Sequence, residues 1–170
     1  MTKVISGKTD SFSVLYDRYC DYLYNYFYRL SNNQQVSEDL TQNVFLRVIK
    51  YKSSFNNKMS FKSWIFQIAR NQFYDFKDKV KKESEIKSEL SRNNEFDEDV
   101  LEGLERYEKL EIALNLLPLE TKEILVLAKY ENMKYKDLAD IYNTSEGTIK
   151  VKVHRGINEL RVKYFELLKQ

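Results

Sequence analysis

Residues Tyr135–Leu160 read YKDLADIYNTSEGTIKVKVHRGINEL, and their pattern predicts a helix-turn-helix, which makes an all-helical fold the first expectation. In its first helix, Ala139 is small enough to let a partner helix approach closely. Asn143 tolerates the left-handed backbone conformation that ends a helix. Thr144 or Ser145 follows with a hydroxyl that can cap the next helix. Small residue, turn and cap occur together here, and together they favour a helical pair over a single bent helix.

The second helix of this motif, expected over residues 145–168, has two chemically different faces. One arc is apolar and predicts the core side: Ile149, Val153, Ile157 and Leu160. The opposite arc has groups that suit a DNA major groove: Thr148, Val151, His154, Arg155 and Asn158, flanked by Lys150 and Lys152. Arginine can donate two hydrogen bonds to guanine, and an outward valine can contact a thymine methyl group. The face therefore predicts duplex reading, and an ordinary solvated basic helix is the alternative.

The rest of the chain also reads as helices. Apolar residues keep helical spacing from Phe12 to Leu30, and a second helix is expected after Ser37, whose hydroxyl can act as a cap. That second helix carries an apolar stripe: Val36, Leu40, Val44, Val48 and Ile49. A third helix is expected over residues 61–82, and no segment alternates as a strand. With only 4 Gly and 1 Pro in 170 residues, the chain is expected to be all-α.

Charge and composition divide the chain into two small helical domains joined by an acidic linker. Residues 83–108 are expected to be the linker, since acids abound there and large apolar groups are few. Residues 1–82 and 109–170 then form the domains, the second containing the helix-turn-helix. Net charge is +5 over residues 1–80, −5 over 81–108 and +2 over 109–170, so both domains could face a polyanion. Ordinary solvated helix faces would explain the charges equally well.

Several classes of protein are disfavoured. One cysteine, Cys20, and one histidine cannot supply an internal disulfide or a Cys/His zinc site, so neither metal nor cofactor is expected. Residues 1–12 lack the apolar core of a secretion signal, and the longest aliphatic run, Ile124–Ala128, is too short to cross a bilayer. A cytoplasmic protein is expected. No phosphate loop or nucleophile–base set is present, so we do not expect an enzyme.

Two surfaces of the N-terminal half are unusual. The outer side of the second helix combines acids and amides with apolar groups, which fits a basic partner helix: Glu38, Asp39, Gln42, Asn43, Phe45 and Leu46. The third helix carries rings all round it, at Phe61, Trp64, Phe66, Phe73, Tyr74 and Phe76, mixed with cations at Lys58, Lys62, Arg70, Lys77 and Lys79. Rings that stack on bases and cations that follow the backbone are typical of single-stranded DNA binding. For the second helix the alternative is an ordinary solvated face, and for the third helix it is ordinary core packing.

Four blocks of the chain together resemble the extracytoplasmic-function (ECF) group of bacterial sigma factors. FSVLYDRYCDYLYNY is similar to the opening helix of that family, and SEDLTQNVFLRVIKY to its polymerase-clamp-binding helix. FKSWIFQIARNQFYDFKDKVKK is similar to its −10-element helix. LLPLETKEILVLAKYENMKYKDLADIYNTSEGTIKVKVHRGINELR resembles its −35-binding domain. The blocks occur in the family's order.

The resemblance implies roles that the residues alone do not. Core RNA polymerase would be bound by Glu38, Asp39, Gln42, Asn43, Phe45 and Leu46. The −10 element would be captured, with a flipped base in the preceding loop, by Phe61, Lys62, Trp64, Arg70, Asn71, Tyr74 and Asp75. The −35 element would be contacted by Tyr135, Thr148, Lys150, Val151, Lys152, His154 and Arg155. The implied partners are the polymerase β′ clamp helices and β flap, promoter DNA and an anti-sigma factor.

Gly156 is one of several positions that depart from the family pattern. Gly156 stands where the family usually has alanine, and we expect this glycine to weaken the recognition helix by up to about 1 kcal/mol. The alternative function is a helix-turn-helix regulator that acts without polymerase. That alternative explains residues 110–170 equally well, but it leaves the surfaces around Asp39 and Trp64 without a role.

Overall fold

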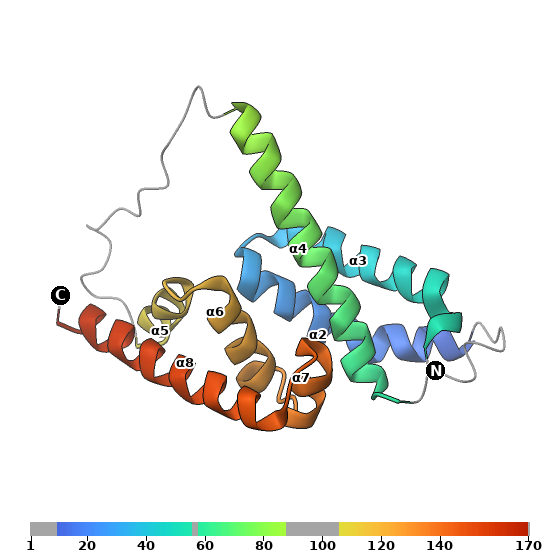
Figure 1. Ribbon diagram of the computed structural model, residues 1–170. Coiled ribbons are helices and arrows are strands. Elements are labelled where there is room, and N and C mark those ends of the chain that lie inside the picture. Colours follow the sequence, from blue (N-terminus) through green and yellow to red (C-terminus); the bar gives the residue numbers. More distant parts are fainter. Residues whose placement is uncertain (1–9, 56–57, 88–105, 170) are drawn as a thin grey trace.

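The computed structural model describes residues 10–55, 58–87 and 106–169, and these ranges are helical without any strand (Figure 1). The N-terminal half contains α2 (Asp10–Ser31), α3 (Gln34–Tyr51), a short 3-10 turn (Lys52–Ser54) and α4 (Phe61–Lys87). The C-terminal half contains α5 (Arg106–Asn115), α6 (Leu119–Leu125), a π-helical turn (Val126–Tyr130), α7 (Tyr135–Tyr142) and α8 (Glu146–Leu167). The all-α prediction is confirmed. Most of the predicted linker lies outside the described residues, although α4 continues to Lys87.

Asparagines end three of the helical segments by adopting the left-handed backbone conformation. Their φ angles are 51° at Asn32, 49° at Asn132 and 48° at Asn143. Asparagine is the non-glycine residue best suited to this region, because its short polar side chain can bond locally. Asn143 was predicted to end the first helix of the helix-turn-helix, and this prediction is confirmed.

The predicted start of the second helix is wrong by about one turn. Asn33 is the N-cap of α3, and its side chain accepts a hydrogen bond of 3.0 Å from the backbone nitrogen of Val36. Ser37 lies inside the helix, fully buried, and donates to the carbonyl of Asn33 at 2.6 Å. A Ser-Glu-Asp run has the composition of a helix start, but Asn33 lies beside the left-handed Asn32 and so takes that place. Ile49, expected in the buried stripe, is 46% exposed.

The rings of α4 face different directions because this helix has neighbours on more than one side. α3 packs along one side of α4 and α7 along another. Phe66 and Phe73 are buried against α2, with ring centroids 5.5 Å from Tyr26 and 6.4 Å from Phe27 respectively. Trp64, only 9% exposed, lies on the side of the loop that precedes α4. Burial on several sides therefore explains a pattern that no single core face could explain.

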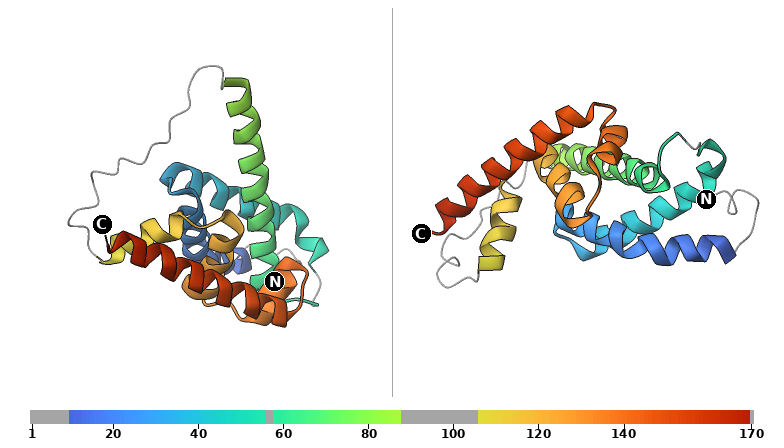
Figure 2. Two further views of the ribbon diagram at one scale, coloured as in Figure 1. Left: turned by 60° about the vertical axis from the view of Figure 1, so that its left-hand side comes forward. Right: turned by 90° about the horizontal axis from the view of Figure 1, so that it is seen from below.

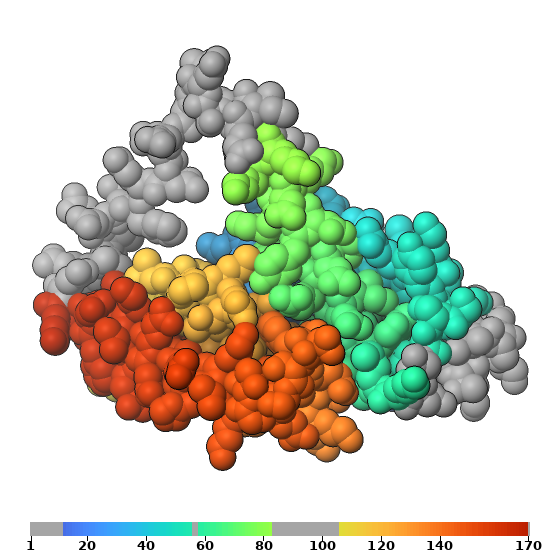
Figure 3. Space-filling view, in the orientation of Figure 1, coloured from blue at the N-terminus to red at the C-terminus, as the bar shows by residue number. Residues whose placement is uncertain are grey.

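The two halves lie against each other and share one continuous apolar cluster. α7 meets the first part of α4, and the π-helical turn meets α2, while the end of α4 projects beyond the C-terminal helices (Figures 1 and 3). α8 runs along the outside of the C-terminal unit (Figure 2). Three charged side chains are nonetheless buried at or near the boundary: Lys122, Glu123 and Glu131.

Candidate nucleic-acid interface

The outer face of α8 is held in position by its buried face and by a cap at its start. Ser145 accepts a hydrogen bond of 3.1 Å from the backbone nitrogen of Thr148. Ile149 and Val153 are 0% and 1% exposed, so they fix the rotation of the helix about its axis. The predicted reading residues on the helix are consequently all exposed: Thr148, Lys150, Val151, Lys152, His154 and Arg155. Val151 is 48% exposed, which leaves its methyl groups available to an apolar partner.

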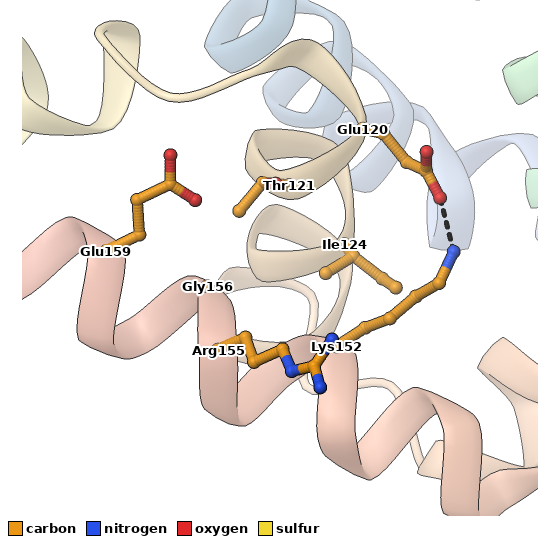
Figure 4. A pocket seen from close by; sticks show the side chains of 7 residues that line it. All are labelled: Glu120, Thr121, Ile124, Lys152, Arg155, Gly156 and Glu159. Atoms are coloured by element: carbon orange, nitrogen blue, oxygen red, sulfur yellow. Dashed lines mark hydrogen bonds and ion pairs between the residues drawn. The ribbon is translucent and has the colours of Figure 1, made fainter.

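A pocket of about 290 Å³ lies between α6 and α8 and includes two of these reading residues (Figure 4). Lys152 and Arg155 project from α8 into its rim, and Glu120 faces them from α6. Lys152 forms an ion pair with Glu120, which lowers the pKa of that carboxyl group. Both partners are substantially exposed, so the pair is weak and a phosphate can compete for the lysine. The side chain of Arg155 runs along α8 toward that of Lys152 (Figure 4).

Gly156 has a packing role that the sequence did not reveal. It is buried where α8 crosses α6. A Cβ atom added there would lie 3.0 Å from Cγ2 of Thr121 and 3.3 Å from the side chain of Leu125. Gly156 is therefore expected to weaken the helix but to improve the packing of α8 on α6, because a residue without a side chain lets the two helices approach closely.

Tyr135, the remaining residue predicted to contact the −35 element, stands at the start of α7 and is half-buried. It lies on a different helix from the other six residues and packs against the core cluster. The structure therefore brings six of the seven predicted residues onto one exposed helix face, with Tyr135 on a neighbouring helix.

A second pocket, of about 170 Å³, lies where α3, the following turn and α4 meet. It includes Trp64 and Asn71, which were predicted for the −10 element, and Ser54 from the loop that was predicted to act with them. It also includes Arg47, which the prediction missed. Phe55 packs edge-on against Trp64, with ring centroids 5.3 Å apart. An aromatic wall beside an amide and a guanidinium can stack and hydrogen-bond an unpaired base. Arg47 went unnoticed because the sequence does not show that α3 and α4 converge.

Asp75 and Phe61 each contact a residue that lines this pocket. Asp75 is exposed and forms an ion pair of 3.6 Å with Arg47. Phe61 is half-buried and lies between the rings of Tyr19, at 5.2 Å, and Trp64, at 5.8 Å. Four of the seven predicted −10 residues therefore surround this pocket or its rim.

The other three predicted −10 residues, Lys62, Arg70 and Tyr74, contact the C-terminal half. Lys62 donates a hydrogen bond of 2.7 Å to the carbonyl of Glu131, and burial lowers the pKa of this lysine. Arg70 and Tyr74 both donate to Oε2 of Glu123, at 3.3 and 3.2 Å. Burial, then the charge of Glu123, raises the pKa of Tyr74 to about 12, so its hydroxyl is a donor at neutral pH.

The outer face of α3 is open to solvent. Asp39, Gln42 and Asn43 are exposed, and Leu46 is 63% exposed. Glu38 is half-buried and accepts a hydrogen bond of 2.9 Å from Gln34. An exposed apolar side chain surrounded by amides and acids, which none of the described helices covers, is typical of a protein-binding face.

Phe45 is the exception among the residues predicted to bind polymerase. The structure places it in the core, 4% exposed, with its ring 4.7 Å from that of Tyr16 and 6.0 Å from that of Phe12. Its position on α3 is one residue from the exposed Leu46, so the helical turn of about 100° per residue directs the two side chains to different sides.

Neither a metal site nor a membrane span is found in the described part of the chain. Within it, no three His, Cys, Asp or Glu side chains gather closely enough to hold a metal ion. Similarly, its helices are too short or too polar to cross a bilayer.

Comparison with known proteins assigns both halves to one family. The family model for sigma-70 region 2 matches residues 15–83, and the model for sigma-70 region 4 matches residues 107–160. The ECF RNA polymerase sigma factor SigW of Bacillus subtilis is 26% identical over 94% of this chain and 91% of its own length. The B. subtilis ECF sigma factor SigM is 29% identical over 88% of this chain and 93% of its own length.

A solved structure extends the likeness to three dimensions. The sigma factor RpoE of Bartonella quintana, crystallised with the anti-sigma factor NepR, has a TM-score of 0.75 and 27% identity, over 95% of this chain and 98% of that one. CnrH, solved with the cytosolic domain of CnrY, has a TM-score of 0.72 at 18% identity, over 95% of this chain and 92% of that one, and supports the fold.

Proposed function

The chain belongs to the ECF sigma factors of the sigma-70 family, and we propose that it uses three separate surfaces to bring core RNA polymerase to promoters. The observation that carries this proposal is the pairing of region 2 and region 4 in one chain, each with its own exposed face. A sigma factor needs both halves, because polymerase binding and strand capture fall to one and duplex recognition to the other. In this division residues 1–82 and 109–170 are the two working domains, and residues 83–108 are the linker.

The α8 face reads the −35 element as duplex DNA in the major groove. Arg155 and His154 reach base edges, and Val151 meets a thymine methyl group. Lys150, Lys152, Thr148 and Tyr135 bond backbone phosphates and fix the register. The support is the exposure of the six α8 residues on one face of a helix that is firmly capped and packed.

The α4 face captures the −10 element as a single strand. Trp64 and Asn71, at the pocket shared with α3, receive a base turned out of the stack. Lys62 and Arg70 attract the strand's phosphates, while Phe61, Tyr74 and Asp75 complete the surface. The support is the presence of rings and polar groups around a pocket of base-accepting character.

The outer face of α3 docks on the β′ clamp helices of the polymerase. Asp39 supplies the charge, Gln42 and Asn43 supply hydrogen bonds, and Leu46 supplies the apolar contact, with Glu38 beside them. Phe45 takes part indirectly, because it holds α3 against α2 from within the core. The β flap is the second contact point on the polymerase, reached by the C-terminal domain.

An anti-sigma factor is a further proposed partner, since the Bartonella relative was crystallised with one. The proposed location is the cytoplasm, where RNA polymerase acts. The chain works as an initiation factor and leaves the catalysis of RNA synthesis to the polymerase.

Transcription by core polymerase tests the proposal directly. Core enzyme is supplied with genomic DNA and the purified chain, and the 5′ ends of the transcripts are sequenced. The proposal expects starts that share a −35 and a −10 sequence and that disappear without the chain. Duplex binding without any new transcripts would instead identify a polymerase-independent helix-turn-helix regulator.

A further inference from the structure

Glu120, in the first turn of α6, is an acid that meets the reading residues of α8 from a different helix. Its carboxylate accepts a hydrogen bond from the ammonium group of Lys152 and forms an ion pair with it. The pair lies at the pocket between α6 and α8, and Arg155 lies beside it on α8 (Figure 4). A negative charge at the edge of a face proposed to bind DNA repels phosphates, so Glu120 by itself lowers the affinity for any duplex.

The two cations at this pocket have different surroundings. Among the side chains drawn in Figure 4, an ion pair joins Lys152 to Glu120, and none joins Arg155 to the pocket's other acid, Glu159. Lysine is a point charge on a flexible stem, which can follow any phosphate within reach. Arginine presents a rigid fork of donors that matches guanine. The acid is therefore bound to the less selective cation, and the cation suited to base reading is left available.

Pairing restricts what Lys152 can contribute to duplex binding. A complex without a fixed register owes nearly all of its affinity to contacts between cations and phosphates. An ammonium group held at α6 takes part only when a phosphate comes close enough to replace the carboxylate of Glu120. Base contacts by Arg155 would fix the position of the duplex, and with it the position of its phosphates. Such a phosphate is then held opposite Lys152 in the correct complex and only fleetingly in a loosely bound one.

The strength of the pair suits this role. The side chains of Lys152 and Glu120 are 42% and 57% exposed, so water screens their attraction. An exposed pair of this kind changes an equilibrium by about two- to fivefold. A phosphate that is held in place can overcome a restraint of this size, whereas brief contacts with passing phosphates are reduced by it.

We propose that Glu120 is a specificity-determining residue, which restrains Lys152 and thereby weakens binding to wrong sequences more than binding to the preferred one. The inference rests on the proposed function, because it requires that α8 reads a duplex. Glu120 acts through Lys152 and is in this sense a positioning residue. The duplex-reading face of the chain therefore extends from α8 onto the first turn of α6.

Duplex binding by the full-length chain tests the proposal. The variant Glu120→Gln removes the charge and keeps the shape of the side chain. Glu166→Gln is the matched control, because Glu166 also forms an exposed ion pair with a lysine, Lys163, but away from the reading residues. Fluorescence anisotropy gives the Kd for two labelled duplexes over a series of KCl concentrations. One duplex has a random sequence, and the other is the sequence that the wild-type chain enriches most from a random library.

Glu120→Gln should bind the random-sequence duplex about two- to fivefold more tightly than the wild type does. The dependence of log Kd on log KCl concentration should steepen by up to about 0.9, the slope of one additional phosphate contact. Binding to the enriched duplex should improve less, so the ratio of the two affinities falls. In a Lys152→Gln background the same change should leave the salt slope unaltered, because the cation that makes the additional contact is absent. The control should match the wild type, and thermal denaturation verifies that every variant is folded.

An equal gain on both duplexes would overturn the proposal, because Glu120 would then act only by repelling DNA. An unchanged Kd and salt slope on the random-sequence duplex would also overturn it, since Lys152 would then be unrestrained in the wild type. If the wild-type chain enriched no duplex at all, the proposed role of α8 would itself be contradicted. This last outcome separates a failure of the proposed function from a failure of the role given to Glu120.

Discussion

The helices α8 and α4 both carry residues that we propose contact DNA, yet they are placed in the molecule in opposite ways. α8 has one buried side, at Ile149 and Val153, and its reading side faces solvent. α4 has neighbours on several sides, and its reading residues are divided between a pocket beside α3 and the contact with Glu123. The face of α8 is therefore open to solvent, whereas part of the face of α4 is covered by the C-terminal half.

The charged groups of the two helices also differ in their surroundings. The cations of α8 face water, with Lys152 in a weak surface pair. Arg70 on α4 instead meets a buried acid of the same chain. Exposed pairs contribute little because water screens them, while breaking a buried pair is expensive because it leaves a charge uncompensated. The two helices should therefore respond differently to mutation and to pH.

The largest effect is expected for Arg155→Ala on the open face. Loss of a bidentate base contact costs about 1–3 kcal/mol, so initiation at promoters with the preferred −35 sequence should fall about 5- to 150-fold. Binding to core polymerase should stay at its wild-type value, because α3 is on the other domain. Run-off transcription and polymerase affinity are the two measurements. Arg161→Ala, an exposed site further along α8, is the matched control.

If Arg155→Ala abolished polymerase binding as well, the separation of the two faces would be wrong. An equal loss in Arg161→Ala would also contradict the assignment, because it would indicate general positive charge rather than a specific contact.

A somewhat smaller effect is expected for Asp39→Arg on the outer face of α3. Reversing a charge at the proposed dock should weaken polymerase binding about tenfold, through lost attraction and new repulsion. Asp17→Arg, exposed on α2, makes the same change of charge away from the dock and should bind normally. Affinity is measured by fluorescence titration of labelled core enzyme. Equal affinities for the two variants would remove α3 from the polymerase interface.

The boundary between the halves should make stability depend on pH, with an effect of about 1–2 kcal/mol. Burial raises the pKa of Glu131 to about 7, so the folded form holds a proton that the unfolded form releases, and stability falls as pH rises from about 4.5 to 7. Burial lowers the pKa of Lys122 to about 8, so stability rises again between about 8 and 10.5. A minimum near pH 7–8 is expected in urea unfolding at constant ionic strength.

Two variants separate the effects of the two groups. Glu131→Gln should remove the fall in stability between about pH 4.5 and 7, and Lys122→Met should remove the rise between about pH 8 and 10.5. A stability that rises steadily from pH 5 to 7 in the wild type would contradict the buried state of Glu131.

The smallest effect is expected within the open reading unit itself, at Gly156→Ala. Alanine favours the helix by roughly 0.5–1 kcal/mol, but overpacking costs about 1–3 kcal/mol, so a net loss of about 1 kcal/mol in unfolding free energy is expected. Gly147→Ala is the matched control, because its nearest new neighbour would be Oγ of Ser145 at 3.7 Å. Thermal denaturation should show a lower Tm for the first variant only. A higher Tm for Gly156→Ala would mean that the side chains of Thr121 and Leu125 move aside at little energetic cost.

Local signals predicted the C-terminal reading unit almost residue by residue. The left-handed Asn143, the cap at Ser145 and the alternation of buried and exposed positions on α8 were all readable, because each depends on residues within one or two turns. Predictions failed where a choice depended on distant neighbours. Ser37 is interior to α3, and Phe45 faces α2 rather than solvent.

The amino-acid sequence was enough to predict that this chain is helical, that it contains a helix-turn-helix, and that it resembles ECF sigma factors. These properties follow from spacing and side-chain chemistry, which act over a few residues. The three-dimensional structure was needed to reveal that Glu123 meets Arg70 and Tyr74, that Arg47 joins Trp64 at a pocket, and that Gly156 allows a second helix to cross closely. Such contacts join residues far apart in the chain, and the packing of whole helices, rather than any local pattern, brings them together.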